Sequence, residues 1–501
     1  MSDVVKKFAP LFEPRSIAFV GASSNPLKWG FQIPFNLIEY GYKGKLYPVN
    51  PHLSELFNLR VYKTVSDIPE KPIDLAVTAV PAQLTLGVVD ECARAGVRAL
   101  IVITAGFSEL GEEGVRAEAE MARIARESGM LVVGPNCMGV VSPYPRRLYC
   151  EMPAVKPEAG TIAMTSQSGN VGATIMRLAM DFRLGMSRCI STGNEASLHT
   201  EDYIEYFGDD SRTNVIAAYI EGVDDGKRFL TVARDVGKKK PVVVLKVGRT
   251  SAGKRAAKSH TGALGGEWEI FRGACRQAGV VEVTDAEELF DTVAAFAREP
   301  LPRGRRVAIV SEGGGWGVLA ADACAEFGLD VIDLPEEVLK QLDEFLPSWW
   351  SRSNPVDLVG GLVEGGLVRS AEILLACDKV DGVIALGVGY LARRAAEYRR
   401  QAAARKNGGL IDKPVYEKFA EAAIARDVEN AKRLAGLIDQ YQKPLVIAAE
   451  TISTVHVDEN KALFALMDER VLVYPTPRRA ARSFAHLANR QAYLTSIGSQ
   501  P

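Results

Sequence analysis

The sequence of 501 residues lacks the features of several specialised classes of protein. No uninterrupted apolar run approaches the ~18 residues of a membrane-spanning helix. The first residues, MSDVVKKFAPLFEPR, lack the apolar segment of a signal peptide. The 7 cysteines are scattered and form no C-x-x-C pair, which is typical of reduced thiols rather than disulfides or zinc ligands. We therefore expect a cytoplasmic protein with no membrane segment and no metal site.

An excess of charge of one sign is also missing. The formal net charge is −2, so no overall electrostatic field indicates a nucleic-acid-binding protein. The sequence instead has 47% hydrophobic residues and 45 glycines, which are typical of a globular protein with many tight turns. Its length predicts about three or four domains, because a single hydrophobic core does not grow that large.

The first domain, residues 1–150, alternates apolar runs with amphipathic segments. The apolar runs end in small, polar or proline-containing turns, and they cover residues 16–25, 45–51, 73–81, 99–106 and 130–136. Alternating strands and helices at this spacing predict a parallel, doubly wound sheet. Ligands of such sheets bind outside the carboxyl ends of the strands. A binding site is therefore expected where these turns gather.

A dinucleotide cofactor is not expected in this domain. The first turn is G-A-S-S-N-P instead of G-x-G-x-x-G, and the second strand ends in P-V-N-P without an acidic residue for a ribose. An NAD-linked dehydrogenase is therefore disfavoured. A ligand with phosphate groups remains plausible, with Lys28 as a candidate partner, and Cys137 is interpreted as a small buried thiol.

The second domain, residues 151–302, contains a polar glycine turn between a strand and a helix. This turn places Ser166, Ser168 and Gly169 at a helix N-terminus, which is suited to binding an anion. The strand at residues 214–222 carries Glu221 at its carboxyl end, on the same predicted edge of the sheet. A carboxylate at this edge could orient a nearby imidazole.

That imidazole is His260, which lies in the glycine-rich and basic segment 248–266 after a buried strand. Glycines allow the backbone to approach a ligand closely, and the lysines and arginine favour an anion. A histidine in such a loop can carry a covalent group as a nucleophile. On spacing alone, a solvated basic loop with an incidental histidine is an equally good interpretation.

The third domain, residues 303–501, repeats the design of the second at an offset of 145, so that Ser166 matches Ser311 and Gly169 matches Gly314. We call residues 151–302 the first repeat and residues 303–501 the second repeat; both are predicted to be flavodoxin-like. The second repeat has Gly389 in place of Glu221, and it lacks a loop like that around His260. A charged helical insertion is expected at about 391–440.

Four short motifs make the chain resemble the alpha subunit of ADP-forming acyl-CoA synthetases, the acetate–CoA ligase type of the succinyl-CoA synthetase superfamily. They are K-S-H-T-G-A at 258–263, G-P-N-C-M-G at 134–139, S-Q-S-G at 166–169 and N-P-V-D at 354–357. The resemblance implies that the first domain is Rossmann-like and binds coenzyme A. The implied CoA contacts are Gly21, Ala22, Ser23, Lys28, Val49, Asn50, Pro81, Thr104 and Asn136.

The resemblance also implies a reaction, acyl-CoA + ADP + phosphate ⇌ carboxylic acid + CoA + ATP. His260 would be phosphorylated transiently, with Glu221 orienting it, and the helix starts at Ser168–Gly169 and Gly314–Gly315 would face the phosphoryl group. All 501 residues are assigned to sheet domains, so ADP or ATP with Mg would bind to an ATP-grasp beta subunit in a hetero-oligomer. Trp316 in the second glycine turn favours an alternative, a non-catalytic CoA-binding subunit or sensor.

Overall fold

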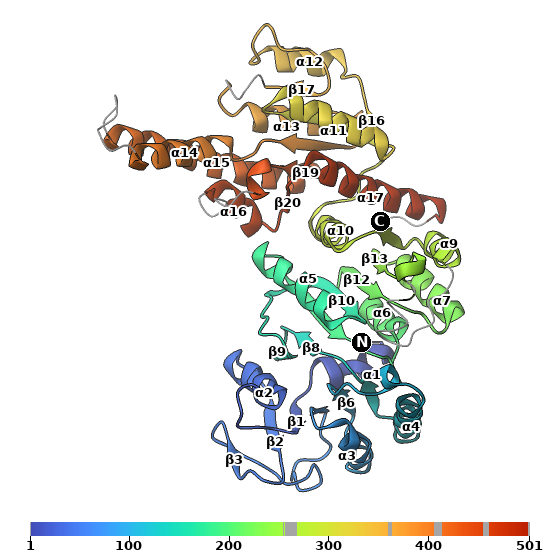
Figure 1. The fold of residues 1–501 in the computed structure, drawn as a ribbon. Coiled ribbons are helices and arrows are strands. Elements are labelled where there is room, and N and C mark those ends of the chain that lie inside the picture. Colours follow the sequence, from blue (N-terminus) through green and yellow to red (C-terminus); the bar gives the residue numbers. More distant parts are fainter. Residues whose placement is uncertain are drawn as a thin grey trace. The chain divides into compact units, whose positions relative to one another are not determined.

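Apolar, β-branched runs form the strands of three mainly parallel sheets in the computed structural model (Figure 1). The structure describes residues 2–253, 255, 268–358, 363–404, 413–453 and 460–498. The chain divides into two compact units, Met1–Val293 with the first two sheets and Ala294–Pro501 with the third. Within the described ranges, every helix is too short or too polar to cross a membrane. The predicted α/β class is confirmed.

The first sheet has five parallel strands in the order β2-β1-β5-β6-β7, drawn in blue in Figure 1. The strands are β1 (Ser16–Val20), β2 (Lys45–Val49), β5 (Leu75–Thr78), β6 (Ala99–Val102) and β7 (Leu131–Val133). The other elements are α1 (Asp3–Phe12), α2 (Trp29–Glu39), β3 (Glu55–Leu56), β4 (Leu59–Arg60), α3 (Ala82–Arg94), η1 (Ser108–Leu110) and α4 (Glu112–Ser128). Every residue of β1, β5, β6 and β7 is buried, which explains their nearly continuous apolar sequences.

The second sheet has seven strands in the order β14-β13-β12-β10-β11-β8-β9. The strands are β8 (Gly139–Ser142), β9 (Leu148–Glu151), β10 (Ala159–Ser166), β11 (Met186–Ser191), β12 (Val215–Ile220), β13 (Val242–Lys246) and β14 (Val281–Val283). The helices are α5 (Gly169–Asp181), α6 (Thr200–Asp209), α7 (Gly226–Gly237), α9 (Trp268–Ala278) and α10 (Ala286–Arg298). Because β8 pairs antiparallel with β11, this sheet begins at Gly139, before the expected boundary at residue 150.

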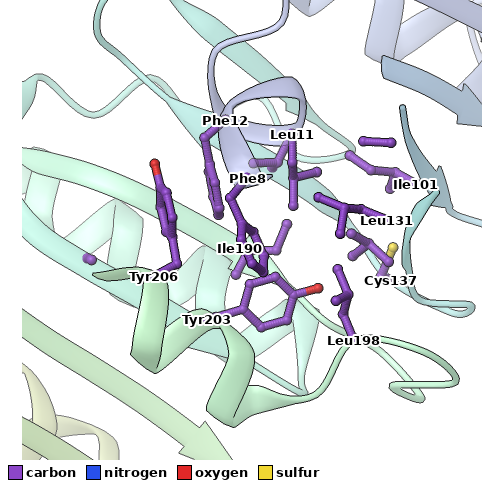
Figure 2. Close-up of a cluster of buried hydrophobic side chains, with 14 of the residues drawn as sticks. Phe8, Leu11, Phe12, Ile101, Leu131, Cys137, Ile190, Leu198, Tyr203 and Tyr206 are labelled. Carbon is purple, nitrogen blue, oxygen red and sulfur yellow. The ribbon is translucent and has the colours of Figure 1, made fainter. Parts of the chain in front are cut away.

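The first two sheets share a hydrophobic core around helix α1 (Figure 2). Phe8 and Phe12 of α1 lie in one cluster with Leu131 of β7, Ile190 of β11 and Tyr206 of α6. The rings of Phe12 and Tyr206 stack with centroids 4.5 Å apart. Aromatic side chains bury large apolar areas, so this cluster holds the two sheets of the first unit together.

A buried guanidinium lies beside this core. The Arg188 side chain on β11 is 1% exposed, and its Nη2 donates to Glu13 Oε1 at 2.7 Å. Nη1 donates to Ser142 Oγ at 3.0 Å, and Nε donates to the Tyr206 hydroxyl at 3.2 Å. A buried charge is tolerated only when it is paired and hydrogen-bonded, and these partners come from α6, β8 and the end of α1.

The third sheet is parallel, with the order β16-β15-β18-β19-β20 and with β17 paired to β15. The strands are β15 (Arg306–Ser311), β16 (Asp330–Val331), β17 (Val356–Asp357), β18 (Gly382–Leu386), β19 (Leu445–Ala448) and β20 (Val473–Tyr474). The other elements are α11 (Gly314–Glu326), α12 (Glu336–Asp343), α13 (Gly366–Ala376), α14 (Tyr390–Ala404), α15 (Lys413–Tyr441), η2 (Glu450–Ser453), α16 (Lys461–Asp468) and α17 (Pro477–Ser496). The segment expected to be a helical insertion thus holds α14 and α15, which pack on each other through small residues such as Ala395 and Ala420.

Strand register aligns the two repeats residue by residue. Ser166 lies opposite Tyr219 in the first repeat, and its counterpart Ser311 lies opposite Leu386 in the second. Tyr219 therefore corresponds to Leu386, so Glu221, two residues later, corresponds to Val388. The sequence comparison that matched Glu221 with Gly389 was wrong by one residue.

Candidate active site

A cavity of about 570 Å³ lies in the first unit, at the carboxyl edge of the first sheet. It is lined from the first domain by Lys28, Trp29, Pro81, Thr104 and Asn136, among others. It is also lined by Gln167, Ser168, Gly169 and Asn170, which lead into helix α5. The cavity therefore joins the predicted coenzyme-binding edge to the predicted anion-binding turn.

The predicted CoA contacts fall into two groups. Lys28, Pro81, Thr104 and Asn136 line the cavity directly. Of the others, Gly21, Ala22 and Ser23 follow β1, Val49 is the last residue of β2, and Asn50 follows it.

The second group is tied together by its own hydrogen bonds. The Gly21 N–H donates to the Val49 carbonyl at 3.1 Å, and Asn50 Nδ2 donates to the Ala22 carbonyl at 2.7 Å. The Ala22 and Val49 side chains are buried in the core, so these two residues present only backbone atoms to a ligand. Gly21 has φ +90°, a conformation that favours glycine, and a Cβ there would lie 3.0 Å from the Ala79 carbonyl oxygen.

Helix α5 begins at the cavity with a capped N-terminus. Ser168 is the N-cap and accepts a hydrogen bond from the Val171 N–H at 3.5 Å, while Ser166 Oγ donates to the Ser168 carbonyl at 2.6 Å. A Cβ on Gly169 would lie 2.3 Å from Met138 Cγ, so glycine is needed beneath that side chain. Free N–H groups and the helix dipole make such an N-terminus suitable for phosphate.

Cys137 lines the same cavity but is 3% exposed. Its Sγ donates to the Val102 carbonyl at 3.3 Å, and burial raises the pKa of the thiol to about 12. A thiol that stays protonated is a poor nucleophile, so the geometry agrees with a buried structural cysteine.

Glu221 follows β12 at the carboxyl edge of the second sheet and is 4% exposed. Its N–H donates to Gln167 Oε1 at 2.5 Å, and its carbonyl accepts from Lys246 Nζ at 2.6 Å. The Tyr219 hydroxyl hydrogen-bonds to the carboxylate; burial, together with this negative charge, raises the pKa of Tyr219 to about 12. His260, the predicted nucleophile, lies outside the residues that the structure describes.

A second buried carboxyl at this edge was not singled out from the sequence. Glu195 has φ 56° and accepts hydrogen bonds from Thr192 Oγ1 at 2.8 Å and Thr200 Oγ1 at 2.6 Å. Burial raises its pKa to about 6, while hydrogen bonds from Thr200, Thr192 and Gln167 act in the opposite direction. The signal that could have indicated it is the polar sequence S-T-G-N-E, which starts at the last residue of β11.

The second repeat has its own cavity, of about 130 Å³, at the carboxyl edge of the third sheet. It is lined by Glu312, Trp316, Val388 and Ala449, among other residues. Burial, with a contribution from the negative charge of Asp427, raises the pKa of Glu312 to about 8. Helix α11 begins at Gly314 and Gly315, and its N-cap Gly313 has no side chain with which to cap it.

Known families match three parts of the chain. Three family models match the chain: a CoA binding domain at residues 15–143, a succinyl-CoA ligase like flavodoxin domain at residues 159–296 and a ligase-CoA domain at residues 307–440. The first covers the predicted coenzyme-binding domain, and the other two fall on the two repeats.

Individual relatives cover nearly the whole chain. The chain is 38% identical to the acetate–CoA ligase [ADP-forming] II subunit alpha of Pyrococcus furiosus, over 90% of this chain and 97% of the relative. It is 37% identical to the corresponding I subunit alpha, over 95% and 96% of the two chains. Names of this kind imply a partner beta subunit.

A solved structure agrees over the full length. The Ca. Korarchaeum cryptofilum dinucleotide forming acetyl-coenzyme A synthetase 1, in complex with phosphate and ADP, matches with a TM-score of 0.83 and 33% identity, over 99% of each chain. The chain therefore belongs to the ADP-forming acyl-CoA synthetases, which are acid–thiol ligases, and within that family it is an alpha-subunit-like chain.

Proposed function

We propose that the chain interconverts acyl-CoA, ADP and phosphate with a carboxylic acid, CoA and ATP, together with an ATP-grasp beta subunit. The observation that carries this proposal is the shared cavity of the first unit. It places Lys28, Thr104 and Asn136 of the CoA-binding domain beside Ser168 and Gly169 at the start of α5. A thioester and a phosphate ion could therefore meet within a single site.

In the first step, a phosphate oxygen held by the α5 N–H groups attacks the thioester carbonyl carbon. A carbon–oxygen bond forms, the carbon–sulfur bond breaks, and CoA leaves as a thiolate that takes up a proton. The helix N-terminus stabilises the charge on the phosphate by preorganised N–H donors. The product is an acyl phosphate.

In the second step, the imidazole of His260 attacks phosphorus and releases the carboxylate. Glu221 orients the ring and stabilises its positive charge. The phosphoryl group then passes to ADP, which binds with Mg to the beta subunit. A covalent carrier divides a transfer between separate sites into two local reactions. Gly314 and Gly315 are proposed to supply a second anion-binding helix start.

Labelling tests the proposal directly. The wild-type chain incubated with acyl-CoA and ³²P-phosphate should acquire an acid-labile label, whereas His260→Ala should acquire none and should still bind CoA in a calorimetric titration. A label on His260→Ala, or an acid-stable label, would contradict the assignment. The alternative function, a non-catalytic CoA-binding subunit or sensor, predicts CoA binding without any label.

A further inference from the structure

The backbone N–H and the backbone carbonyl of Glu221 are each held by a side chain that has no role in the proposed reaction steps. Gln167 Oε1 accepts from the Glu221 N–H at 2.5 Å and from the Gly222 N–H at 3.1 Å. On the other side, Lys246 Nζ donates to the Glu221 carbonyl at 2.6 Å. The backbone from which the Glu221 carboxylate projects is therefore fixed at its donor and at its acceptor.

Gln167 is well placed to hold this segment because it uses both ends of its amide. Its Nε2 donates to the Gly222 carbonyl at 3.0 Å, and the side chain also hydrogen-bonds to the buried Glu195 carboxyl. The residue also lines the 570 Å³ cavity. It therefore lies between the cavity and the strand end that carries Glu221.

Lys246 reaches the same peptide from the neighbouring strand. It is the last residue of β13, is 4% exposed, and also donates to the Val247 carbonyl at 2.6 Å. Removing a cation from water is costly unless its donors are satisfied, and here the ammonium donates to carbonyls at the strand ends. This position makes the lysine a support for the backbone.

The second repeat lacks all three members of this arrangement. The offset of 145 matches Gln167 with Glu312, and the strand register matches Glu221 with Val388. In the same register Lys246 corresponds to Ala449, because Leu245 pairs with Tyr219 as Ala448 pairs with Leu386. Glu312, Val388 and Ala449 all line the 130 Å³ cavity. The second repeat therefore has a cavity at the place where Gln167 and Lys246 contact Glu221 in the first.

We propose that Gln167 and Lys246 are positioning residues that fix the backbone of Glu221, so that its carboxylate is held in one orientation at the carboxyl edge of the second sheet for the proposed phosphoryl transfer. The inference rests on the proposed function and extends it to two residues outside the reacting groups. Without these two side chains, the backbone that follows β12 would lose the hydrogen bonds that fix its orientation. A misplacement of about 1 Å in a catalytic group can cost about 100-fold in rate.

The test separates phosphoryl transfer from coenzyme binding in the full-length chain. Phosphoenzyme formation is started from ³²P-acyl phosphate, and CoA affinity is measured by titration. Gln167→Met keeps the length of the side chain but removes its hydrogen bonds. We expect it to form phosphoenzyme about 10- to 100-fold more slowly while CoA affinity stays within about twofold. Gln277→Met, on the exposed face of α9, is the matched control and should behave as wild type.

Lys246 supplies an independent variant if Gln167→Met does not fold. Lys246→Met should slow phosphoenzyme formation, and Lys246→Arg should restore part of the rate because it can still donate to the Glu221 carbonyl. Equal labelling of wild type and both methionine variants, or an equal fall in the labelling rate and in the CoA affinity, would overturn this inference alone. An unlabelled wild-type chain would overturn the proposed function and this inference with it.

Discussion

The two repeats use one scaffold for different local chemistry. In both, a strand ends in a serine and a glycine turn leads into a helix, α5 in the first repeat and α11 in the second. Beyond the turn they differ: polar contacts fill the strand ends around Glu221, whereas Val388 and Ala449 border a cavity. The same glycine turn therefore lies beside polar, hydrogen-bonded strand ends in one repeat and beside a cavity in the other. The residues at the neighbouring strand ends decide what the turn can support.

The largest effect is expected from Glu221→Val. This substitution gives the first repeat the side chain found at the same register in the second. We expect phosphoenzyme formation to fall about 100- to 1000-fold, because His260 would lose the carboxylate that is proposed to orient it and stabilise its charge. Labelling from acyl phosphate measures the rate. Glu221→Gln removes the negative charge but keeps the shape of the side chain. If the Glu221→Val variant is labelled at the wild-type rate, Glu221 has no role in phosphoenzyme formation.

A second change tests the anion-binding turn of the first repeat. Gly169→Ala would bring a Cβ within 2.3 Å of Met138 Cγ and 2.6 Å of its sulfur, so Met138, which lines the cavity, would have to shift. We expect the KM for phosphate to rise about tenfold, which corresponds to about 1.4 kcal/mol of transition-state stabilisation.

The matched control for this change is Gly273→Ala in α9, where a Cβ would meet no atom within 4 Å. It should leave the KM for phosphate unchanged, and a helical alanine should slightly increase stability. An equal rise in KM in both glycine variants would show that the effect is not local to the α5 turn.

The last prediction concerns the pH dependence of stability and the second repeat, away from the proposed reaction. Burial raises the pKa of Glu312 to about 8, against about 4.3 for an unfolded chain. Between these values the folded state keeps a proton that the unfolded state has released, so this carboxyl lowers stability progressively as pH rises from about 4 to about 8. Glu312→Gln, which installs the residue of the first repeat, should raise stability at pH 9, where the wild-type carboxyl is ionised in both states, and should leave stability unchanged near pH 4.

Denaturant unfolding of wild type and Glu312→Gln at both pH values measures this difference. A gain of the same size at pH 4 and pH 9 would mean that ionisation of Glu312 is not the cause. Glu344→Gln, at an exposed carboxyl after α12, is a suitable control and should show no gain at either pH.

Much of the fold could be predicted from periodicity. Apolar runs separated by amphipathic helices indicate parallel sheets, because strands covered on both faces must be apolar throughout. The antiparallel strands β8 and β9 were missed because G-V-V-S and L-Y-C-E have no feature that shows with which sheet they pair. The one-residue error at Glu221 has a similar cause. Glycines at 387 and 389 allow two alignments, and only the hydrogen-bonded ladder selects one.

The candidate site could be predicted in part. Strand-end turns indicated Lys28, Thr104 and Asn136, which do line the cavity. The roles of Gln167 and Lys246 could not be predicted, because both bind backbone atoms of Glu221, and a backbone partner leaves no pattern in the sequence.

The segment from Gly134 to Glu151 has a consequence for recombination between relatives. Met138 covers Gly169 and its N–H donates to Ser191 Oγ at 3.0 Å, and the next residues extend the second sheet as β8 and β9. A chimera that exchanged the coenzyme-binding part at Gly139 would therefore join one parent's cavity wall to the other parent's antiparallel strands. A crossover placed after Glu151 would transfer the cavity-lining residues together with β8 and β9, so that the contacts between them would come from a single parent.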